Sequence, residues 1–386
     1  MIDTIIYDKN SQVTGIALLK SGEVKNIEII SGNQAISGNV YLGKITKKVS
    51  LAHDREGFFV NIGDGKEAFL NGDEYGMNEA KLVEGQSVVV QVAQERHAEK
   101  NARLVRSIQL VGTYVVYCPY RMDVGASNKI EDKNKVAELI EAVKGEVTGQ
   151  EGWVLRTAAG DVNFSVIAEE MKQLRDTFEN IRIKARNEQA PYLLYSKPDS
   201  VWEYINFYKN SLEKVVTNNR NLQDMLSDNV EFIVSNSPFE EYGVDEVIGE
   251  ALEKTVVLKH GGRVTIEETK ACVAIDVDSG KDNGGGALNR LNEEAAYEIA
   301  KQIRLRNLAG KIVVDFAGHS EYRYIKPLLE ILEKELNKDM TKSRVIGLSH
   351  GGLVEIIRVR KRPTLQELMS EECPTCQGTG RVEKGE

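Results

Sequence analysis

One sequence feature constrains the fold of this chain most. It is a predicted strand–helix–strand unit in which each strand carries an aspartate near its end. The stretch KACVAIDVDSG predicts the first strand, and its alternation places Asp276 and Asp278 on the face opposite the apolar residues. The helix predicted next repeats apolar residues at three- and four-residue steps, and Gly310 is expected in its C-cap position. The second strand, KIVVDFAGH, carries Asp315.

A strand, a helix and a strand of these lengths form a right-handed crossover in which the two strands are parallel. Asp276 and Asp315 are therefore expected at the carboxyl ends of neighbouring strands, where α/β sheets place their active sites. Carboxylates without a histidine or cysteine beside them suit Mg²⁺ or Mn²⁺, which activates water and stabilises a phosphoryl transition state. The alternative is that Asp276 and Asp278 only cap the following turn, and the matching position of Asp315 argues against it.

The composition indicates a protein of about two to four domains. With 386 residues, 41% of them hydrophobic, the chain can bury several separate cores. No apolar run approaches the ~20 residues that cross a bilayer, and the first residues do not resemble a signal peptide, so we expect a cytoplasmic protein without membrane contact. The net charge of −9 argues weakly against nucleic acid as a partner, unless local lysines such as Lys44, Lys47 and Lys48 supply the attraction.

Alternating strands separated by glycine turns predict a five-stranded barrel between residues 38 and 117. This stretch resembles the OB-fold RNA-binding domain, in which aromatic side chains stack on bases and lysines follow the backbone. Phe59 and Phe69 are the stacking candidates, and Lys100 is the candidate cation. Phe58 and Phe59 point to opposite faces of one strand, so only one of them belongs to the barrel core, and periodicity does not decide which.

The segment between residues 118 and 201 places Arg156 and Thr157 directly after an apolar strand. A guanidinium and a hydroxyl in that position can hold a phosphate by charge-assisted hydrogen bonds. A surface salt bridge is the commoner role of an arginine, and the residues alone favour it.

The sequence CPTCQGTG near the end of the chain predicts half of a zinc site. Cys373 and Cys376 have the two-residue spacing of zinc ligands, and the proline and glycines suit a tight knuckle. Cys118 and Cys272 lie far away in the sequence and do not convincingly supply the two missing ligands. The alternatives are a second copy of the chain, His350 of the same chain, or an unoccupied surface turn.

These motifs together resemble one known family. AIDVDSG, the helix NEEAAYEIAKQIRLRNLAG, the strand KIVVDF and the terminal CPTCQGTG are similar to the catalytic half of the ribonuclease E/G family, and the barrel precedes them in the family's order. The resemblance implies an α/β and β multidomain fold, in a short form without the family's C-terminal small domain and scaffold tail. Its parts would be an RNase H-like domain (residues 1–37 and 202–257) interrupted by an OB-fold barrel (38–117) and a 5′-sensor domain (118–201), then a DNase I-like α/β domain (258–370) and a zinc-link knuckle (371–386).

The resemblance also implies a role for each candidate site residue. Asp276 and Asp315 match the family's catalytic, Mg²⁺-binding aspartates, while Asp278 stands where typical members have asparagine and is a third candidate ligand. Arg156 then belongs to a phosphate pocket rather than to a salt bridge. The implied sets are Phe59, Phe69 and Lys100 for RNA binding, Gly112, Val116, Arg156, Thr157 and Arg344 for the 5′-phosphate, and Cys373 and Cys376 for a zinc ion shared across a homodimer, about half a zinc per chain.

The function implied by the resemblance is that of a Mg²⁺- or Mn²⁺-dependent endoribonuclease. Such an enzyme cuts single-stranded, A/U-rich RNA into products with 5′-phosphate and 3′-hydroxyl ends, is stimulated by a 5′-monophosphate, and acts in rRNA processing and mRNA decay. No DNA is expected as a partner. A non-catalytic RNA-binding or ribosome-associated protein is the alternative, and the intact pair of Asp276 and Asp315 argues against it.

Overall fold

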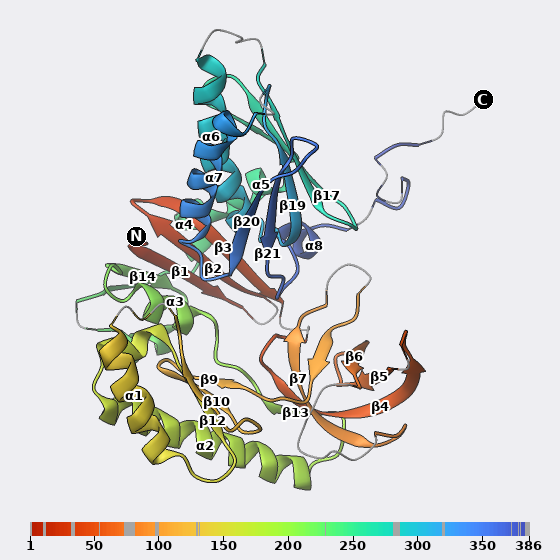
Figure 1. Cartoon of the computed structure of the whole chain (residues 1–386), viewed down its shortest axis with the longest axis vertical. Coiled ribbons are helices and arrows are strands. Elements are labelled where there is room, and N and C mark those ends of the chain that lie inside the picture. The colour runs from red at the N-terminus through yellow and green to blue at the C-terminus, as the bar shows by residue number, and fades with distance from the viewer. Residues whose placement is uncertain are drawn as a thin grey trace. The chain divides into compact units, whose positions relative to one another are not determined.

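The computed structural model describes residues 2–10, 13–31, 35–53, 55–72, 82–96, 100–128, 130, 132–227, 229–280, 286–318, 321–371, 373–376, 378 and 380–382. The chain forms two units: unit 1 comprises Met1–Gly32 and Ser211–Glu386, and unit 2 comprises Asn33–Asn210 (Figure 1). Among the described residues, no helix combines the length and the apolar character needed to span a bilayer.

The first sheet of unit 1 combines strands from before unit 2 in the sequence with strands from after it. Its order is β15-β14-β1-β2-β3. β1 pairs in parallel with β14, with Thr4 opposite Lys214. Between β2 and β3, Ser21 and Gly22 both have positive φ angles, 50° and 81°, as a tight hairpin turn requires. The elements are β1 (Thr4–Lys9), β2 (Val13–Lys20), β3 (Glu23–Ser31), β14 (Lys214–Thr217), η2 (Arg220–Met225), β15 (Glu231–Val234), α4 (Pro238–Glu241) and α5 (Val244–Leu252).

The barrel predicted from the glycine-spaced strands is confirmed in unit 2. β4 pairs with β5 on one side and with β7 on the other, which closes the ring of strands β4-β5-β6-β8-β7. Apolar residues of alternate positions fill its interior, among them Phe58, Leu70 and Leu104. The strands are β4 (Val40–Ser50), β5 (Glu56–Asn61), β6 (Glu67–Asn71), β7 (Ser87–Gln94) and β8 (Arg103–Val105), and β13 (Tyr192–Tyr195) adds to β4 outside the ring.

A second sheet of unit 2, in the order β11-β12-β10-β9, packs against two helices. Trp153 and Leu155 of β12 are fully buried against Ile167 and Met171 of α2. β10 pairs with β12, and β9 pairs with β10, so this sheet takes strands from before the domain boundary that the resemblance placed at residue 118. The elements are β9 (Leu110–Val111), β10 (Val115–Cys118), β11 (Val124–Ala126), α1 (Lys133–Glu146), β12 (Gly152–Leu155), η1 (Thr157–Asp161), α2 (Phe164–Asn187) and α3 (Val201–Tyr208).

The six-stranded sheet of unit 1 has the order β16-β17-β18-β19-β21-β20. β18 and β19 are parallel neighbours joined through α6, so the predicted strand–helix–strand unit is confirmed. α6 and α7 lie against one face of this sheet (Figure 1), and their apolar residues share one core with it. The elements are β16 (Thr255–Val257), β17 (Arg263–Glu268), β18 (Val273–Asp278), α6 (Ala287–Leu305), β19 (Gly310–Asp315), α7 (Tyr322–Leu336), β20 (Ser343–Leu348), β21 (Val354–Arg358) and α8 (Leu365–Met369).

The expected C-cap of α6 at Gly310 is wrong. The helix ends at Leu305, and Asn307 takes the left-handed conformation with a φ of 50°. The N–H of Leu308 donates to the carbonyl of Ile303 at 3.0 Å, and the N–H of Asn307 donates to Arg304 at 3.2 Å. These two bonds form a Schellman motif in which asparagine replaces glycine. Gly310 instead begins β19.

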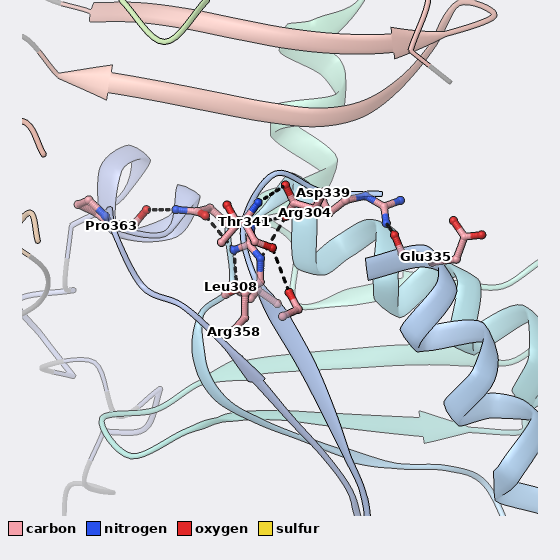
Figure 2. A network of polar contacts seen from close by, with 9 residues as sticks. Arg304, Leu308, Glu335, Asp339, Thr341, Arg358 and Pro363 are labelled. Carbon is pink, nitrogen blue, oxygen red and sulfur yellow. Dashed lines mark hydrogen bonds and ion pairs between the residues drawn. The ribbon is translucent and has the colours of Figure 1, made fainter. Parts of the chain in front are cut away.

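A buried polar network surrounds Arg358 (Figure 2), and its hydrogen bonds hold Asn307 in that conformation. Arg358 donates from Nε and Nη2 to Oδ2 of Asp339, at 3.2 and 2.7 Å, and both side chains are only 2% exposed. Its Nη1 donates to Oδ1 of Asn307 and to the carbonyl of Leu308, both at 2.9 Å. The Asn307 amide in turn donates to the carbonyl of Pro363 at 2.8 Å. The network therefore connects the ends of α6, α7 and β21.

We predict that Asp339→Asn lowers the free energy of unfolding by about 3–5 kcal/mol, because Arg358 stays charged and buried after it loses its counter-charge. Urea denaturation followed by circular dichroism measures this loss. Glu330→Gln is the matched control, since its pair with Lys326 on α7 is exposed and at 4.0 Å. An exposed pair contributes about 0–1 kcal/mol, so equal losses in the two variants would contradict the prediction.

Candidate functional site

Asp276 and Asp315 lie directly opposite each other in the parallel pairing of β18 with β19. Neighbouring strands are about 4.8 Å apart, so the two carboxylates start from adjacent backbone positions. The residues before them, Ile275 and Val314, are also register partners and are buried in the core beneath α6 and α7. Both aspartates consequently point to the opposite, exposed face. The expected position of this pair at the carboxyl ends of neighbouring parallel strands is confirmed.

The surroundings of this aspartate pair suit a hard cation. Within the described part of the chain, neither carboxylate has a hydrogen-bond or ion-pair partner, so their oxygens are available. No group of three metal-binding side chains is found among the described residues. Two carboxylates fit Mg²⁺, which keeps several waters and completes its shell with substrate phosphate oxygens.

Asp278 has a different environment from the pair. Its Oδ2 accepts hydrogen bonds from Nε and Nη2 of Arg263 on β17, at 3.0 and 2.8 Å. Its Oδ1 accepts the N–H of Gly280 at 3.0 Å. The Gly280 N–H and then the Arg263 guanidinium hold the pKa of Asp278 below its ordinary range. Capping of the following turn therefore describes Asp278 but not Asp276, and a metal ion would have to compete with Arg263 for Asp278.

Asn292 is a site residue that the sequence patterns did not indicate. It is fully buried on α6. Its Nδ2 donates to the carbonyl of Ala317 at 3.0 Å, and its Oδ1 accepts the N–H of the same residue at 3.2 Å. Ala317 follows Asp315 by two residues, so Asn292 fixes the chain as it leaves the candidate site. The available signal was an asparagine on the apolar face of the helix, next to Leu291.

The structure brings the two stacking candidates of the barrel together. Phe59 and Phe69 are register partners on β5 and β6, with ring centroids 5.8 Å apart and an interplanar angle of 70°. Phe58 is 2% exposed, so it is the core residue of the two that periodicity left open, and Phe59 lies on the outer face. A Cβ on Gly57 would lie 2.6 Å from Cζ of Phe69, so glycine leaves room for this ring. Lys100 is exposed.

Four of the five residues of the predicted 5′-phosphate pocket lie in unit 2. Arg156 donates from Nη1 to the carbonyl of Gly112. Its neighbour Thr157 shares a hydrogen bond with Ser127, with 3.2 Å between the hydroxyl oxygens. No ion pair of Arg156 is present among the described residues, so the salt bridge favoured by the residues alone is not observed. Val116 lies on β10 of the same sheet, whereas Arg344 is an exposed residue of β20 in unit 1.

The cysteine pair lies in the segment after α8. The backbone N–H groups of Cys376 and Thr375 lower the pKa of the Cys373 thiol, as suits a metal-binding thiolate. His350 does not join the two cysteines in any group of three possible ligands among the described residues. Cys118 is buried within unit 2, and burial raises the pKa of its thiol.

The sequence of this chain is similar to those of known proteins over most of its length. Residues 109–361 match the family described as the Ribonuclease E/G family. Ribonuclease G of Haemophilus influenzae is 30% identical over 96% of this chain and 82% of its own length. Ribonuclease G of Escherichia coli is 30% identical over 99% of this chain and 85% of its own length. Ribonuclease E of Haemophilus influenzae is 28% identical over 96% of this chain and 43% of its own length. The chain therefore belongs to the ribonuclease E/G family.

Proposed function

We propose that this family member is a metal-dependent endoribonuclease that hydrolyses single-stranded, A/U-rich RNA to 5′-phosphate and 3′-hydroxyl ends and acts in RNA processing and decay. The observation that carries the proposal is the register pairing of Asp276 with Asp315 on the exposed face of the six-stranded sheet. The names of the relatives, Ribonuclease G and Ribonuclease E, support RNA as the substrate.

In this proposal, separate residues of the chain would bind the metal ion, hold the site in place and bind the RNA. Asp276 and Asp315 would hold Mg²⁺ or Mn²⁺, and the bound ion would supply water activation and stabilisation of the developing negative charge. The hydrogen bonds of Asn292 to Ala317 keep the end of β19, and with it the backbone of Asp315, in place. Phe59 and Phe69 would stack on bases, and Lys100 would attract the phosphate backbone.

We predict that Asp276→Asn and Asp315→Asn each lower the cleavage rate by more than about a hundredfold, because each removes a metal-binding carboxylate. RNA affinity should persist, since the stacking residues belong to the barrel. The measurement is cleavage of a single-stranded A/U-rich oligonucleotide with and without Mg²⁺, beside a filter-binding assay. Cleavage by either variant at the unmutated rate would contradict the assignment.

Asp278→Asn is the matched substitution in the same strand. Its effect should be smaller, because the Asp278 carboxylate is already bound by Arg263 and Gly280 and asparagine can still accept the Gly280 N–H. A loss as large as that of Asp315→Asn would place Asp278 among the metal ligands instead.

A second prediction concerns the 5′ end of the RNA. We expect a higher kcat/KM for a 5′-monophosphorylated substrate than for its 5′-hydroxyl or 5′-triphosphate counterparts, because Arg156 and Thr157 offer donors for a single phosphate. Arg156→Ala should bring the ratio of 5′-monophosphate to 5′-hydroxyl kcat/KM close to one. Arg186→Ala, an exposed arginine in the last turn of α2, is the control that should preserve the ratio. Equal kcat/KM values for the three substrates in the unmutated protein would show that no 5′ sensing occurs.

A third prediction concerns zinc. We expect about half a zinc ion per chain and a homodimer, because Cys373 and Cys376 supply two of the four ligands of a tetrahedral site and a second copy supplies the others. Metal analysis combined with light scattering measures both quantities. Cys373→Ser should lower the zinc content and the fraction of dimer together. One tightly bound zinc ion in a monomeric protein would rule the shared site out.

A further inference from the structure

One carboxylate in unit 2 accepts three consecutive backbone N–H groups. Oε1 of Glu170 accepts from Thr113 at 2.5 Å, and Oε2 accepts from Tyr114 at 2.7 Å and from Val115 at 3.0 Å. Hydrogen bonds to an ionised acceptor are about twice as strong as neutral ones, and successive N–H groups that converge in this way form an anion-binding concavity. The loop between β9 and β10 is therefore organised around the Glu170 carboxylate.

Gly112 gives this carboxylate the space it occupies. A Cβ at position 112 would lie 2.5 Å from Cδ of Glu170 and 2.7 and 2.8 Å from its two oxygens, closer than real contacts allow. All three of the atoms nearest to such a Cβ belong to Glu170. The close approach of the Glu170 carboxylate is thus enough to explain why position 112 is a glycine. A ligand need not approach the backbone there.

The same loop holds Arg156 on its other side. The carbonyl of Gly112 accepts a hydrogen bond from Nη1 of Arg156. The backbone N–H of Arg156 donates to the carbonyl of Tyr114 at 2.7 Å. Among the described residues, no hydrogen bond or ion pair joins Glu170 to Arg156. Both are bonded to residues 112–115, so the position of the guanidinium depends on the carboxylate through the loop.

The N–H groups of this loop have no capacity left for a phosphate. Besides the three bound by Glu170, the N–H of Gly112 donates to the carbonyl of Val115 at 2.9 Å. Glu170 lies on α2 between the buried residues Ile167, one turn before it, and Met171, directly after it. Because these two residues anchor the helix, the backbone of Glu170 is held in place. A 5′-phosphate would consequently be bound by side chains such as those of Arg156 and Thr157.

We propose that Glu170 is a positioning residue for 5′-monophosphate recognition: it fixes the loop from Gly112 to Val115 and thereby aims the Arg156 guanidinium. The proposal rests on the 5′-sensing part of the function proposed above. In this role Glu170 acts through its bonds to the backbone and is not itself a phosphate ligand.

The first test is Glu170→Gln, which keeps the size of the side chain but replaces one acceptor oxygen by an NH₂ group that faces backbone donors. The ratio of 5′-monophosphate to 5′-hydroxyl kcat/KM should fall at least about fivefold, the effect of leaving part-buried N–H groups unpaired. Glu169→Gln is the matched control, because it removes the same charge from the neighbouring exposed residue, and it should preserve the ratio. Thermal unfolding of each variant separates loss of the fold from loss of recognition.

The outcomes separate this proposal from the function on which it rests. If the unmutated protein discriminates between 5′ ends and Glu170→Gln discriminates equally well, the positioning role is overturned while 5′ sensing stands. A ratio that rises in Glu170→Gln would show that the carboxylate competes with phosphate for the N–H groups, and this would also overturn the positioning role. Absence of discrimination in the unmutated protein would overturn both.

A double-mutant cycle tests the explanation of the glycine. Gly112→Ala alone should lower the ratio, because its Cβ displaces the Glu170 carboxylate. Added to Glu170→Ala, the same change should have little further effect, because the atoms that it meets are gone. An equal effect of Gly112→Ala in both backgrounds would show that the glycine serves direct access of the phosphate, which contradicts the role of Glu170.

Discussion

The parallel pairing of β18 with β19 is the constraint on which both the core of unit 1 and its candidate site depend. Ile275 opposite Val314 buries one pair of side chains beneath the helices, and Asp276 opposite Asp315 exposes the next pair. Because side chains alternate between faces, a slip of one residue in either strand would bury its carboxylate and expose an apolar residue. The packing that stabilises the sheet therefore also keeps the two carboxylates adjacent.

The aspartate pair could be predicted because it follows from two general rules, alternation along strands and the crossover of parallel strands. The choice between Phe58 and Phe59 could not, because alternation separates their faces without saying which face is inside. The tertiary structure decides that question, because Phe58 is buried in the core of the closed barrel. Glycine was the natural expectation for the end of α6, but Asn307 takes that role through partners such as Arg358, 51 positions away.

Asn292 and Glu170 were missed for a related physical reason. Each recognises backbone groups of a distant loop, Ala317 in one case and residues 113–115 in the other. Backbone N–H and C=O groups are present at almost every position, so a sequence does not reveal which of them folding brings to a polar side chain. A lone asparagine or glutamate on a helix has no distinguishing pattern until the tertiary structure supplies its partner.

The insertion of unit 2 within unit 1 has a consequence for the order in which the protein folds. β1 and β2 are synthesised first, but β14, the parallel partner of β1, follows only after the whole of unit 2 has been made. Every strand of the two sheets of unit 2 comes from unit 2 itself. Unit 2 can therefore fold while the ribosome is still extending the chain. Once unit 2 is compact, fewer freely moving residues separate β1 from β14, which reduces the entropic cost of joining them. Early folding of unit 2 would thus make it easier for β1 and β14 to pair once β14 has been synthesised.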